Sequence, residues 1–323
     1  MVPGPAPVAE WIISSFPLLS TPRKISDLIM EFGTDNEWFA SEVDADQKSE
    51  KWSRPVVRRL RKYLNSSRED WQPCRFDFNE SDQLLIQGAS LPLPSDSADV
   101  ADAKVALSYV DQYKKAVRSL DARQFEYLCG GILTLLGCGF PRITPRSGDQ
   151  GIDFFGEFKM TGRLDAKYLL GGPDRLMKSW VVGQAKHYDK EVGPNEIREL
   201  AGSHYLASMG VSYDGGRALA EYRAAALQAR HVFFVTTGRL TAGTRELVAR
   251  AGIIVLDEAR IAAVLALHSI ARESADVDQV AFKSWLTDVK TALDAPQPTE
   301  DETEDEDEDD DDDEEEDGPG TDA

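Results

Sequence analysis

The sequence predicts an α/β protein in which a mixed sheet is flanked by helices, with a smaller N-terminal α+β module and a disordered acidic tail. Three observations support this prediction. Short apolar runs alternate with helical stretches after residue 140. An Asp- and Ser-rich stretch, 95–102, separates that region from the first hundred residues. Residues 300–323 hold 18 of the 57 acidic residues and no Lys or Arg, so they cannot fold into a compact core.

The expected domains are an N-terminal module at 1–100, a larger α/β domain at 104–294 and the tail at 295–323. The tail dominates the net charge of −21, because the remaining chain carries 39 acidic against 36 basic residues, a net of −3. Net charge therefore does not exclude nucleic-acid binding by the folded part. The tail can simply aid solubility, or it can imitate a phosphate backbone and compete with DNA for a basic groove.

The N-terminal module opens with a Pro- and Ser-rich stretch, 1–22, which we interpret as an arm or a loosely docked segment. Four local elements are expected after it: a helix at Ile25–Phe32, a basic amphipathic helix opening at Ser53-Arg54-Pro55, and strands at Phe76–Phe78 and Gln83–Ile86. Helices followed by a hairpin favour a winged-helix-like DNA reader or, equally, a small module with a solvated basic face.

The larger domain begins with two predicted helices, Val105–Leu120 and Asp121–Leu136, the second capped by Asp121. Five short strands follow, at Phe140–Thr144, Ile152–Phe158, Trp180–Ala185, His231–Thr236 and Gly252–Leu256. Helices are expected between and after them, at Pro194–Met209, Arg217–Ala229, Thr241–Ala251, Ala259–His268 and Val277–Leu293. Residues 159–179 are interpreted as an inserted loop or hairpin at the rim.

Three polar residues on neighbouring strands form the candidate catalytic site. Asp153 follows a glycine-flanked loop, and Gln184 and Lys186 lie two residues apart on the next strand, on one face and about 7 Å from each other. A carboxylate and an amide oxygen suit Mg²⁺, which prefers hard oxygen ligands. A lysine beside them can orient or deprotonate an attacking water and offset developing negative charge. This set favours metal-assisted phosphodiester hydrolysis.

Several further motifs stand in order around these residues. They are Phe125-Glu126, Gly148-Asp149-Gln150-Gly151-Ile152-Asp153, Gln184-Ala185-Lys186, Val192-Gly193, Leu200-Ala201-Gly202, Val235-Thr236-Thr237-Gly238 and Ala251-Gly252-Ile253. The ordered set resembles the Mrr-like branch of the PD-(D/E)xK restriction endonucleases, over roughly 121–267, in the variant that carries Gln in place of the second acidic residue.

The resemblance implies a restriction-endonuclease-like fold and a Mg²⁺-dependent DNA endonuclease, with Mn²⁺ able to substitute. It implies Asp153, Gln184 and Lys186 as the catalytic core. Glu126 is implied as a supporting acid that reaches the metal directly or through water. It also implies restriction, that is, defence against foreign DNA. The alternatives left open are a non-catalytic DNA- or protein-binding module on the same fold, and a repair nuclease for branched or single-stranded DNA.

Phosphate contacts are expected from Arg146, Lys190 and Arg239, each of which can equally be plain surface charge. His187 should point away from Gln184 and Lys186. The expected substrate is double-stranded DNA. Because cutting both strands needs two active sites, a homodimer or higher homo-oligomer is expected. A partner protein could engage the N-terminal module or the tail.

The remaining sequence signals favour a cytoplasmic protein. Cys74, Cys129 and Cys138 form no CxxC pair, and the four histidines have no zinc-ligand spacing. The N-terminus lacks the basic region of a signal peptide, and no apolar stretch is long enough to span a membrane. We therefore expect reduced thiols and no membrane partner.

Overall fold

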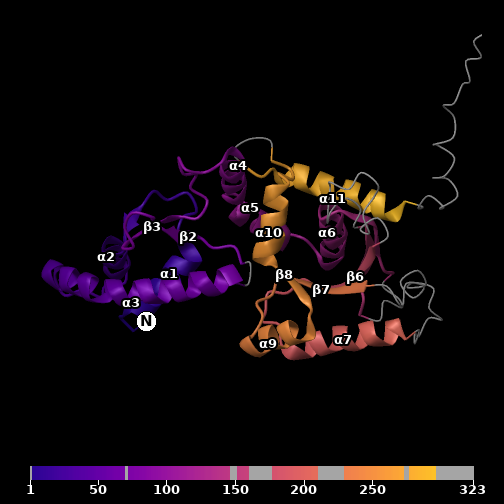
Figure 1. The fold of residues 1–323 in the computed structure, drawn as a ribbon, viewed down its shortest axis with the longest axis horizontal. Coiled ribbons are helices and arrows are strands. Elements are labelled where there is room, and N and C mark those ends of the chain that lie inside the picture. Colours follow the sequence, from indigo (N-terminus) through magenta and orange to yellow (C-terminus); the bar gives the residue numbers. More distant parts are fainter. Residues whose placement is uncertain are drawn as a thin grey trace, which may run out of the picture.

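The computed structural model describes most of the chain, and Figure 1 shows its arrangement. The described ranges are 2–69, 72–145, 151–159, 177–209, 229–272 and 276–295. The inserted loop within 159–179, the helix expected at Arg217–Ala229 and the acidic tail lie largely or wholly outside these ranges.

Three helices and a small sheet form the N-terminal module, of which the sequence predicted two helices and two strands. The helices are α1 (Pro5–Ser15), α2 (Ile25–Asp35) and α3 (Glu42–Glu69). The sheet is antiparallel, in the order β1 (Arg23–Lys24), β3 (Leu85–Gly88) and β2 (Phe76–Phe78). One apolar cluster joins the helices to the sheet, so this module has a core of its own.

The prediction of a loosely docked N-terminal arm is wrong. Residues 5–15 form α1, which starts at Pro5, where the missing N–H costs no hydrogen bond. Val8 and Ile12 are four residues apart, so they share a face, and both are completely buried. Burying a side chain such as Ile12 contributes about 1.5–3 kcal/mol. The sequence contains this apolar spacing. The side chains are buried, however, only because α1 packs against α2 and α3, which the sequence does not show.

Helix α3 begins at Glu42, eleven residues before the predicted start. Pro55 lies inside the helix and removes one backbone donor from it. Ser53, just before it, donates its hydroxyl to the carbonyl oxygen of Ser49 at 2.7 Å. Ser49, Ser53, Val56, Leu60 and Leu64 are buried at helical spacing, so packing on α1 and α2 holds the helix across the proline.

The larger sheet has five strands in the order β4-β5-β6-β7-β8. Their bounds are β4 Cys138–Ile143, β5 Phe154–Lys159, β6 Lys178–Lys186, β7 Ala229–Thr236 and β8 Ile254–Asp257. The pairs β4–β5 and β5–β6 are antiparallel, whereas β6–β7 and β7–β8 are parallel. This confirms the predicted mixed sheet.

Helices cover both faces of this sheet (Figure 1). They are α4 (Ala98–Leu107), α5 (Val110–Arg118), α6 (Ala122–Leu135), α7 (Pro194–Ser208), α9 (Ala242–Ala251), α10 (Glu258–Leu267) and α11 (Gln279–Asp294). Residues of α5, α6, α10 and α11 share one core with the sheet, while α7 and α9 contribute to two smaller clusters on the other face. The fold class expected from the sequence is therefore confirmed.

Two sequence-based boundaries differ from the structure in this region. The helix predicted at Val105–Leu120 is broken at Ser108–Tyr109 into α4 and α5. The predicted linker at 95–102 overlaps α4, since Ser97 caps that helix by accepting from the Val100 N–H. The division into domains at 100 and 294 stays a prediction. None of the described helices combines the length and apolar character needed to cross a membrane.

Candidate active site

Asp153 is fixed by three backbone groups at the point where β5 and β6 stop pairing. Its N–H donates to the Gly183 carbonyl at 2.9 Å, and its own carbonyl accepts from the Thr144 N–H at 3.0 Å. The carboxylate oxygen Oδ2 accepts from the Ala185 N–H at 2.7 Å. The first residue of β5 that pairs with β6 is Phe154. The Asp153 carboxylate therefore bonds the β6 backbone just beyond the end of the strand pairing.

Gln184 and Lys186 lie on the side of β6 that faces α7. Val182, two residues before Gln184, packs in a cluster with Ala207 of α7, and alternate residues of a strand share a face. Gln184 is 1% exposed, whereas Lys186 at the strand end is half-buried. The two residues flank Ala185, whose N–H binds the Asp153 carboxylate, and they share one face of β6, as the strand spacing predicted.

The amide oxygen of Gln184 is buried without a hydrogen-bond partner among the described residues. The space around the side chain is tight: a Cβ added at Gly151 would come 3.3 Å from Gln184 Nε2 and 2.9 Å from Ser203 Oγ of α7. An orphaned buried oxygen costs about 1–3 kcal/mol unless water or an ion satisfies it. A hydrogen-bond donor or a cation bound at this oxygen would remove that cost.

Glu126 is held by a neighbouring arginine. Arg123, one helical turn earlier on α6, forms an ion pair with its carboxylate. The same guanidinium donates to the Thr144 carbonyl at 3.3 Å and lies over the Tyr127 ring, 4.8 Å from its centroid. In this arrangement the Glu126 carboxylate is already neutralised by a cation.

Cys129 shows how Glu126 and Asp153 lie relative to each other. Burial raises the pKa of its thiol well above the usual value, and the charges of Asp153 and Glu126 raise the pKa further. Both carboxylates are thus within electrostatic reach of one buried group on α6. Since α6 covers the sheet face opposite α7, Glu126 and Gln184 approach Asp153 from different sides. Among the described residues, no three Asp, Glu, His or Cys side chains form a group able to hold a metal.

His187 points away from Gln184 and Lys186, in agreement with the strand alternation. Its Nε2 lies 3.2 Å from the Val117 carbonyl oxygen, and its ring makes an edge contact with Phe125 at 5.1 Å between centroids. These are packing contacts with α5 and α6, so His187 has no place in the candidate site.

Two of the three residues predicted to contact phosphate lie on neighbouring loops. Lys190 and Arg239 are both exposed and belong to adjacent loops, at the carboxyl ends of β6 and β7. Lys190 lies over the Tyr188 ring at 4.9 Å, and the two loops are joined by a Val192 N–H to Arg239 carbonyl bond of 2.9 Å. Arg146 lies outside the described residues.

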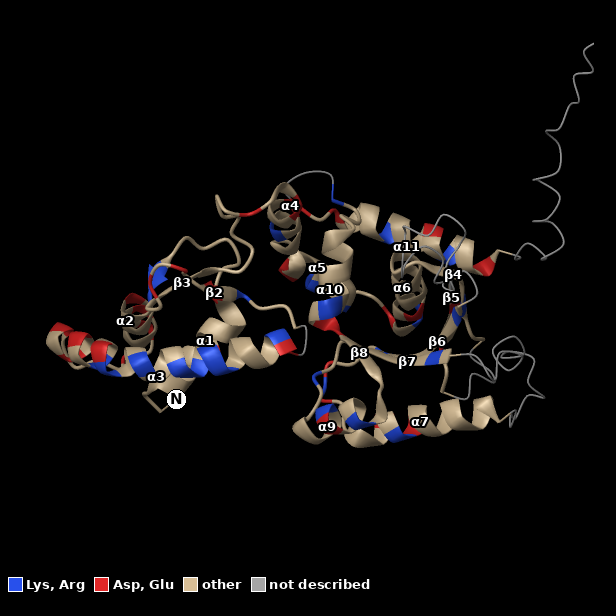
Figure 2. Ribbon diagram, viewed as in Figure 1, with Lys and Arg blue, Asp and Glu red and all other residues tan. Residues whose placement is uncertain are grey.

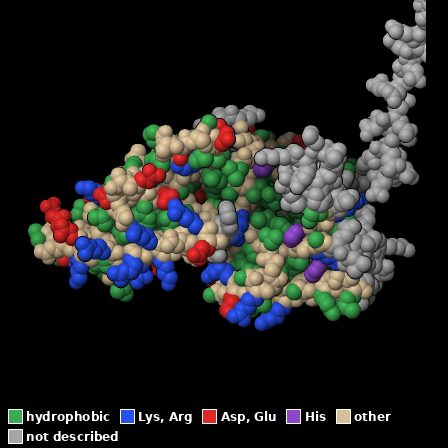
Figure 3. Space-filling view, viewed as in Figure 1, with side chains coloured by type: hydrophobic (Ala, Val, Ile, Leu, Met, Phe, Trp, Pro, Cys, Tyr) green, Lys and Arg blue, Asp and Glu red, His purple; other side chains and the backbone are tan. Residues whose placement is uncertain are grey.

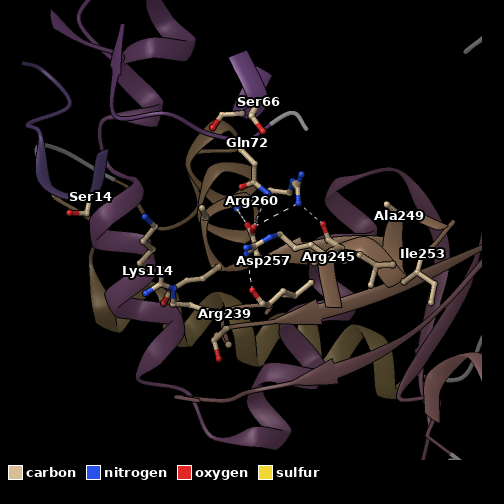
Figure 4. Close-up of a pocket in the computed structure, with 18 of the residues that line it drawn as sticks. Ser14, Ser66, Gln72, Lys114, Arg239, Arg245, Ala249, Ile253, Asp257 and Arg260 are labelled. Atoms are coloured by element: carbon tan, nitrogen blue, oxygen red, sulfur yellow. Dashed lines mark hydrogen bonds and ion pairs between the residues drawn. The ribbon is translucent and has the colours of Figure 1, made fainter. Parts of the chain in front are cut away.

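A cleft of about 920 Å³ opens between the N-terminal module and the carboxyl ends of β7 and β8. Figure 4 shows its wall, to which α1, α3, α5, α9 and α10 contribute. Five cationic residues line it, namely Lys114, Arg118, Arg239, Arg245 and Arg260. The sequence pointed to only Arg239 of these, because the others lie on three helices, α5, α9 and α10, and no local motif connects them.

Two acidic residues balance part of this cationic lining. Glu258 forms an ion pair with Arg118, and Asp257 accepts from Gln72 Nε2 at 3.0 Å. Asp257 also caps α10 and lies 3.8 Å from Arg260. The cleft therefore joins residues far apart in the chain at the edge of the parallel strands, where α/β sheets commonly bind ligands.

Comparison with known proteins connects this geometry to one family. Residues 117–210 match the family model described as "Restriction endonuclease" (Mrr_cat). The match spans Glu126, Asp153, Gln184 and Lys186, so it confirms the resemblance expected from the sequence over that segment. The expected resemblance at 211–267 lies beyond the matched range.

Two solved structures are similar to the chain at a low level. One is described as "DNA modification-dependent restriction endonuclease AspBHI", with 17% identity, a TM-score of 0.35, and coverage of 62% of this chain and 41% of that one. The other is "MspJI Restriction Endonuclease in Complex with 27-mer Oligonucleotide", with 18% identity, a TM-score of 0.30, and coverage of 62% and 37%. The chain thus spans less than half of either structure, and likeness at this level does not establish a shared function. No curated protein matches the chain.

Proposed function

Because residues 117–210 carry a domain of the restriction endonuclease family, we propose that the chain is a Mg²⁺-dependent endonuclease that hydrolyses the phosphodiester bonds of double-stranded DNA. The observation that carries this proposal is the buried, unpartnered amide oxygen of Gln184. Gln184 is followed in the chain by Ala185, whose N–H binds the carboxylate of Asp153, and two further bonds hold the Asp153 backbone. A divalent cation bound by both groups would satisfy the oxygen.

The donor set fits such a cation. Asp153 offers one carboxylate and Gln184 one amide oxygen, both hard ligands of the kind Mg²⁺ prefers. When bound, the metal would supply Lewis-acid stabilisation of the phosphate charge and a water of lowered pKa. Mn²⁺, with similar ligand preferences, is expected to substitute.

The chain's own residues supply the remaining roles. Lys186 follows Gln184 on the same face, and none of the described residues forms an ion pair with it. Its ammonium group is therefore available to orient a water and to offset charge that develops on the phosphate. Lys190 and Arg239, on the adjoining loops, hold neighbouring phosphates in this proposal.

Glu126 is assigned a supporting role at the metal. Its carboxylate is held by Arg123 in the described arrangement, so it contributes only after Arg123 releases it or through a bridging water. Cleavage of both DNA strands requires two copies of the site, and we propose a homodimer or higher homo-oligomer for that reason. Restriction of foreign DNA is the proposed setting.

A second candidate function is a DNA- or protein-binding module without catalysis. The ion pair between Arg123 and Glu126 favours it, because it engages a carboxylate that the nuclease proposal assigns to the metal. A divalent-metal titration separates the two functions, since only the nuclease requires metal binding at Asp153 and Gln184.

The direct test is cleavage of supercoiled plasmid, methylated and unmethylated, in Mg²⁺ or in EDTA. The proposal predicts cutting in Mg²⁺ only, because the metal supplies the activated water. Asp153→Ala and Lys186→Ala should each reduce the cleavage rate by roughly 10²–10⁴-fold, the range expected for groups that act in proton transfer and charge stabilisation.

Lys283→Ala provides the control, because Lys283 is exposed on α11 and far from β6 in the sequence. Its cleavage rate should equal that of the wild type. Cutting that persists in EDTA, or that survives in the Asp153 variant, would contradict the assignment of the site.

A further inference from the structure

One face of α3 carries a line of exposed cations. The buried face of this helix packs on α1, α2 and the small sheet, while the other face carries Lys51, Arg54, Arg58 and Lys62, all exposed. Their spacing of three or four residues puts them on one side of the helix. They span about 16 Å along its axis at 1.5 Å per residue. Figures 2 and 3 show Lys and Arg gathered along α3. We call these four residues the α3 stripe.

The α3 stripe differs from the other cations of the same helix. Arg68 pairs with Asp77 of the hairpin at 2.8 Å, and Arg61 bonds Gln83 and lies over the Phe78 ring at 5.3 Å. Within the described part of the chain, no acidic side chain pairs with any residue of the stripe or with the adjacent Arg59. Like charges so placed repel one another at a cost, which an anionic partner would relieve.

The α3 stripe continues toward the candidate active site. A shallow hollow of about 360 Å³ beside α1 is lined by Arg59, Lys62, Tyr63 and Ser66. Tyr63 and Ser66 also line the larger cleft, whose opposite wall carries Arg239. The two depressions therefore share a wall and form one continuous surface from α3 to the loop after β7.

The strand register shows how close the end of β6 lies to this surface. Lys186 pairs with Thr236, and Thr236 pairs with Asp257, which lines the cleft. Neighbouring strands lie about 4.8 Å apart, so the end of β6 is about two strand spacings from the cleft wall. A ligand that follows the cations from α3 through the cleft thus arrives near the candidate catalytic lysine.

We propose that the α3 stripe binds the sugar-phosphate backbone of duplex DNA and, with Arg239 and Arg245 of the cleft, positions the duplex for cleavage beyond β6. A rigid, straight row of cations suits a duplex, which presents one phosphate charge per about 1.7 Å of its axis. A membrane surface would require several apolar side chains between the cations, and among the described residues of this face only Pro55 is apolar. The choice of DNA as ligand rests on the proposed function, but the surface itself is tested without catalysis.

The test is fluorescence anisotropy of a labelled duplex with the full chain in EDTA, at several salt concentrations. The variant Arg58→Gln/Lys62→Gln removes two charges from the α3 stripe. The slope of log Kobs against log salt should become less steep by about 1.8, because each phosphate contact contributes about 0.9. Near 0.1 M salt the affinity should fall by roughly 60-fold on the same relation.

The matched control is Lys24→Gln/Lys283→Gln, which makes the same charge change at two exposed lysines away from the stripe. It should leave slope and affinity near those of the wild type. If both double variants lose affinity equally, net charge alone explains the effect and the stripe has no special role. If neither changes the slope, the stripe does not bind DNA.

The acidic tail is the competing occupant of this face. Zero-length cross-linking between Lys51 or Lys62 and the carboxylates of 300–317 distinguishes it. Cross-links that persist when saturating duplex is added would assign the face to the tail and overturn the proposal. Because the anisotropy assay needs no metal, its failure is also distinct from a failure of the nuclease assignment, which the plasmid assay tests separately.

Discussion

The end of β6 and the outer face of α3 hold their polar groups in opposite ways. At β6, Gln184 is 1% exposed and Asp153 is bound to three backbone groups. On α3 the four cations of the stripe are exposed, and no acidic residue in the described ranges pairs with them. A buried, rigid arrangement favours a defined geometry, whereas exposed charges act over several ångströms and tolerate motion. The difference is consistent with the two proposed roles, catalysis at β6 and DNA docking on α3.

Two buried glutamine side chains, Gln184 on β6 and Gln87 on β3 of the N-terminal module, give the sharpest contrast. Gln184→Leu should reduce cleavage by roughly 10²-fold, as for the loss of one charge-stabilising group. It should also raise the free energy of unfolding by about 1 kcal/mol, because an unsatisfied buried oxygen disappears. Plasmid cleavage and urea denaturation measure the two effects.

Gln87 in the N-terminal module is the matched control for Gln184. It is 4% exposed and its Oε1 accepts from Asn79 Nδ2 at 2.9 Å, so its amide oxygen is satisfied. Gln87→Leu should lower the free energy of unfolding by about 1 kcal/mol and leave the cleavage rate unchanged at saturating DNA. If Gln184→Leu loses stability and keeps its cleavage rate, Gln184 has the same structural role as Gln87 and does not bind a metal.

The separate core of the N-terminal module provides the next comparison. Ile12→Ala should destabilise that module by about 2–5 kcal/mol, the cost of a cavity at a completely buried position. Ile13→Ala, at the half-buried neighbouring position, should lower the free energy of unfolding by less. Denaturation should show an early transition for the Ile12 variant, and DNA affinity should fall with it while the far-UV signal of the larger domain remains. Loss of both regions in one transition would show that they fold as a unit.

The smallest expected effect concerns the ion pair between Arg123 and Glu126. Arg123→Gln frees the carboxylate, so the Mg²⁺ concentration for half-maximal cleavage should fall by about twofold to fivefold. The gain is limited because a partly exposed pair contributes only about 1 kcal/mol or less. Lys290→Gln is the control, since Lys290 also lies against the Tyr127 ring, at 5.8 Å. An unchanged Mg²⁺ requirement in the Arg123 variant would leave Glu126 with no role at the metal.

The sequence predicted those features that depend on local pattern. Short apolar runs located all five strands of the larger sheet, and Asp121 was correctly identified as the cap of α6, where it forms a capping box with Gln124. Gln184 and Lys186 lie on one face of β6 as expected, which is a property of strand geometry, and Asp153 directly precedes the neighbouring strand β5.

Features that depend on long-range contacts were missed. The docking of α1 needs α2 and α3 as partners, and the early start of α3 depends on packing that outweighs a proline inside the helix. The pairing of Glu126 with Arg123 required side-chain positions, although the i, i+3 spacing permitted it. The cleft joins segments as distant as Tyr63 and Arg260, and no local motif in the sequence indicates such a meeting.

The most direct test of the division between chemistry and docking is the single-turnover cleavage rate at saturating duplex, measured beside the dissociation constant in EDTA. Lys186→Ala should lower the rate by at least roughly 10²-fold with little change in affinity. Arg58→Gln/Lys62→Gln should weaken binding by roughly 60-fold near 0.1 M salt and keep the rate of the wild type once DNA saturates. If the stripe variant is slow at saturation, or the Lys186 variant loses affinity in place of rate, the two regions do not have the separate roles assigned to them.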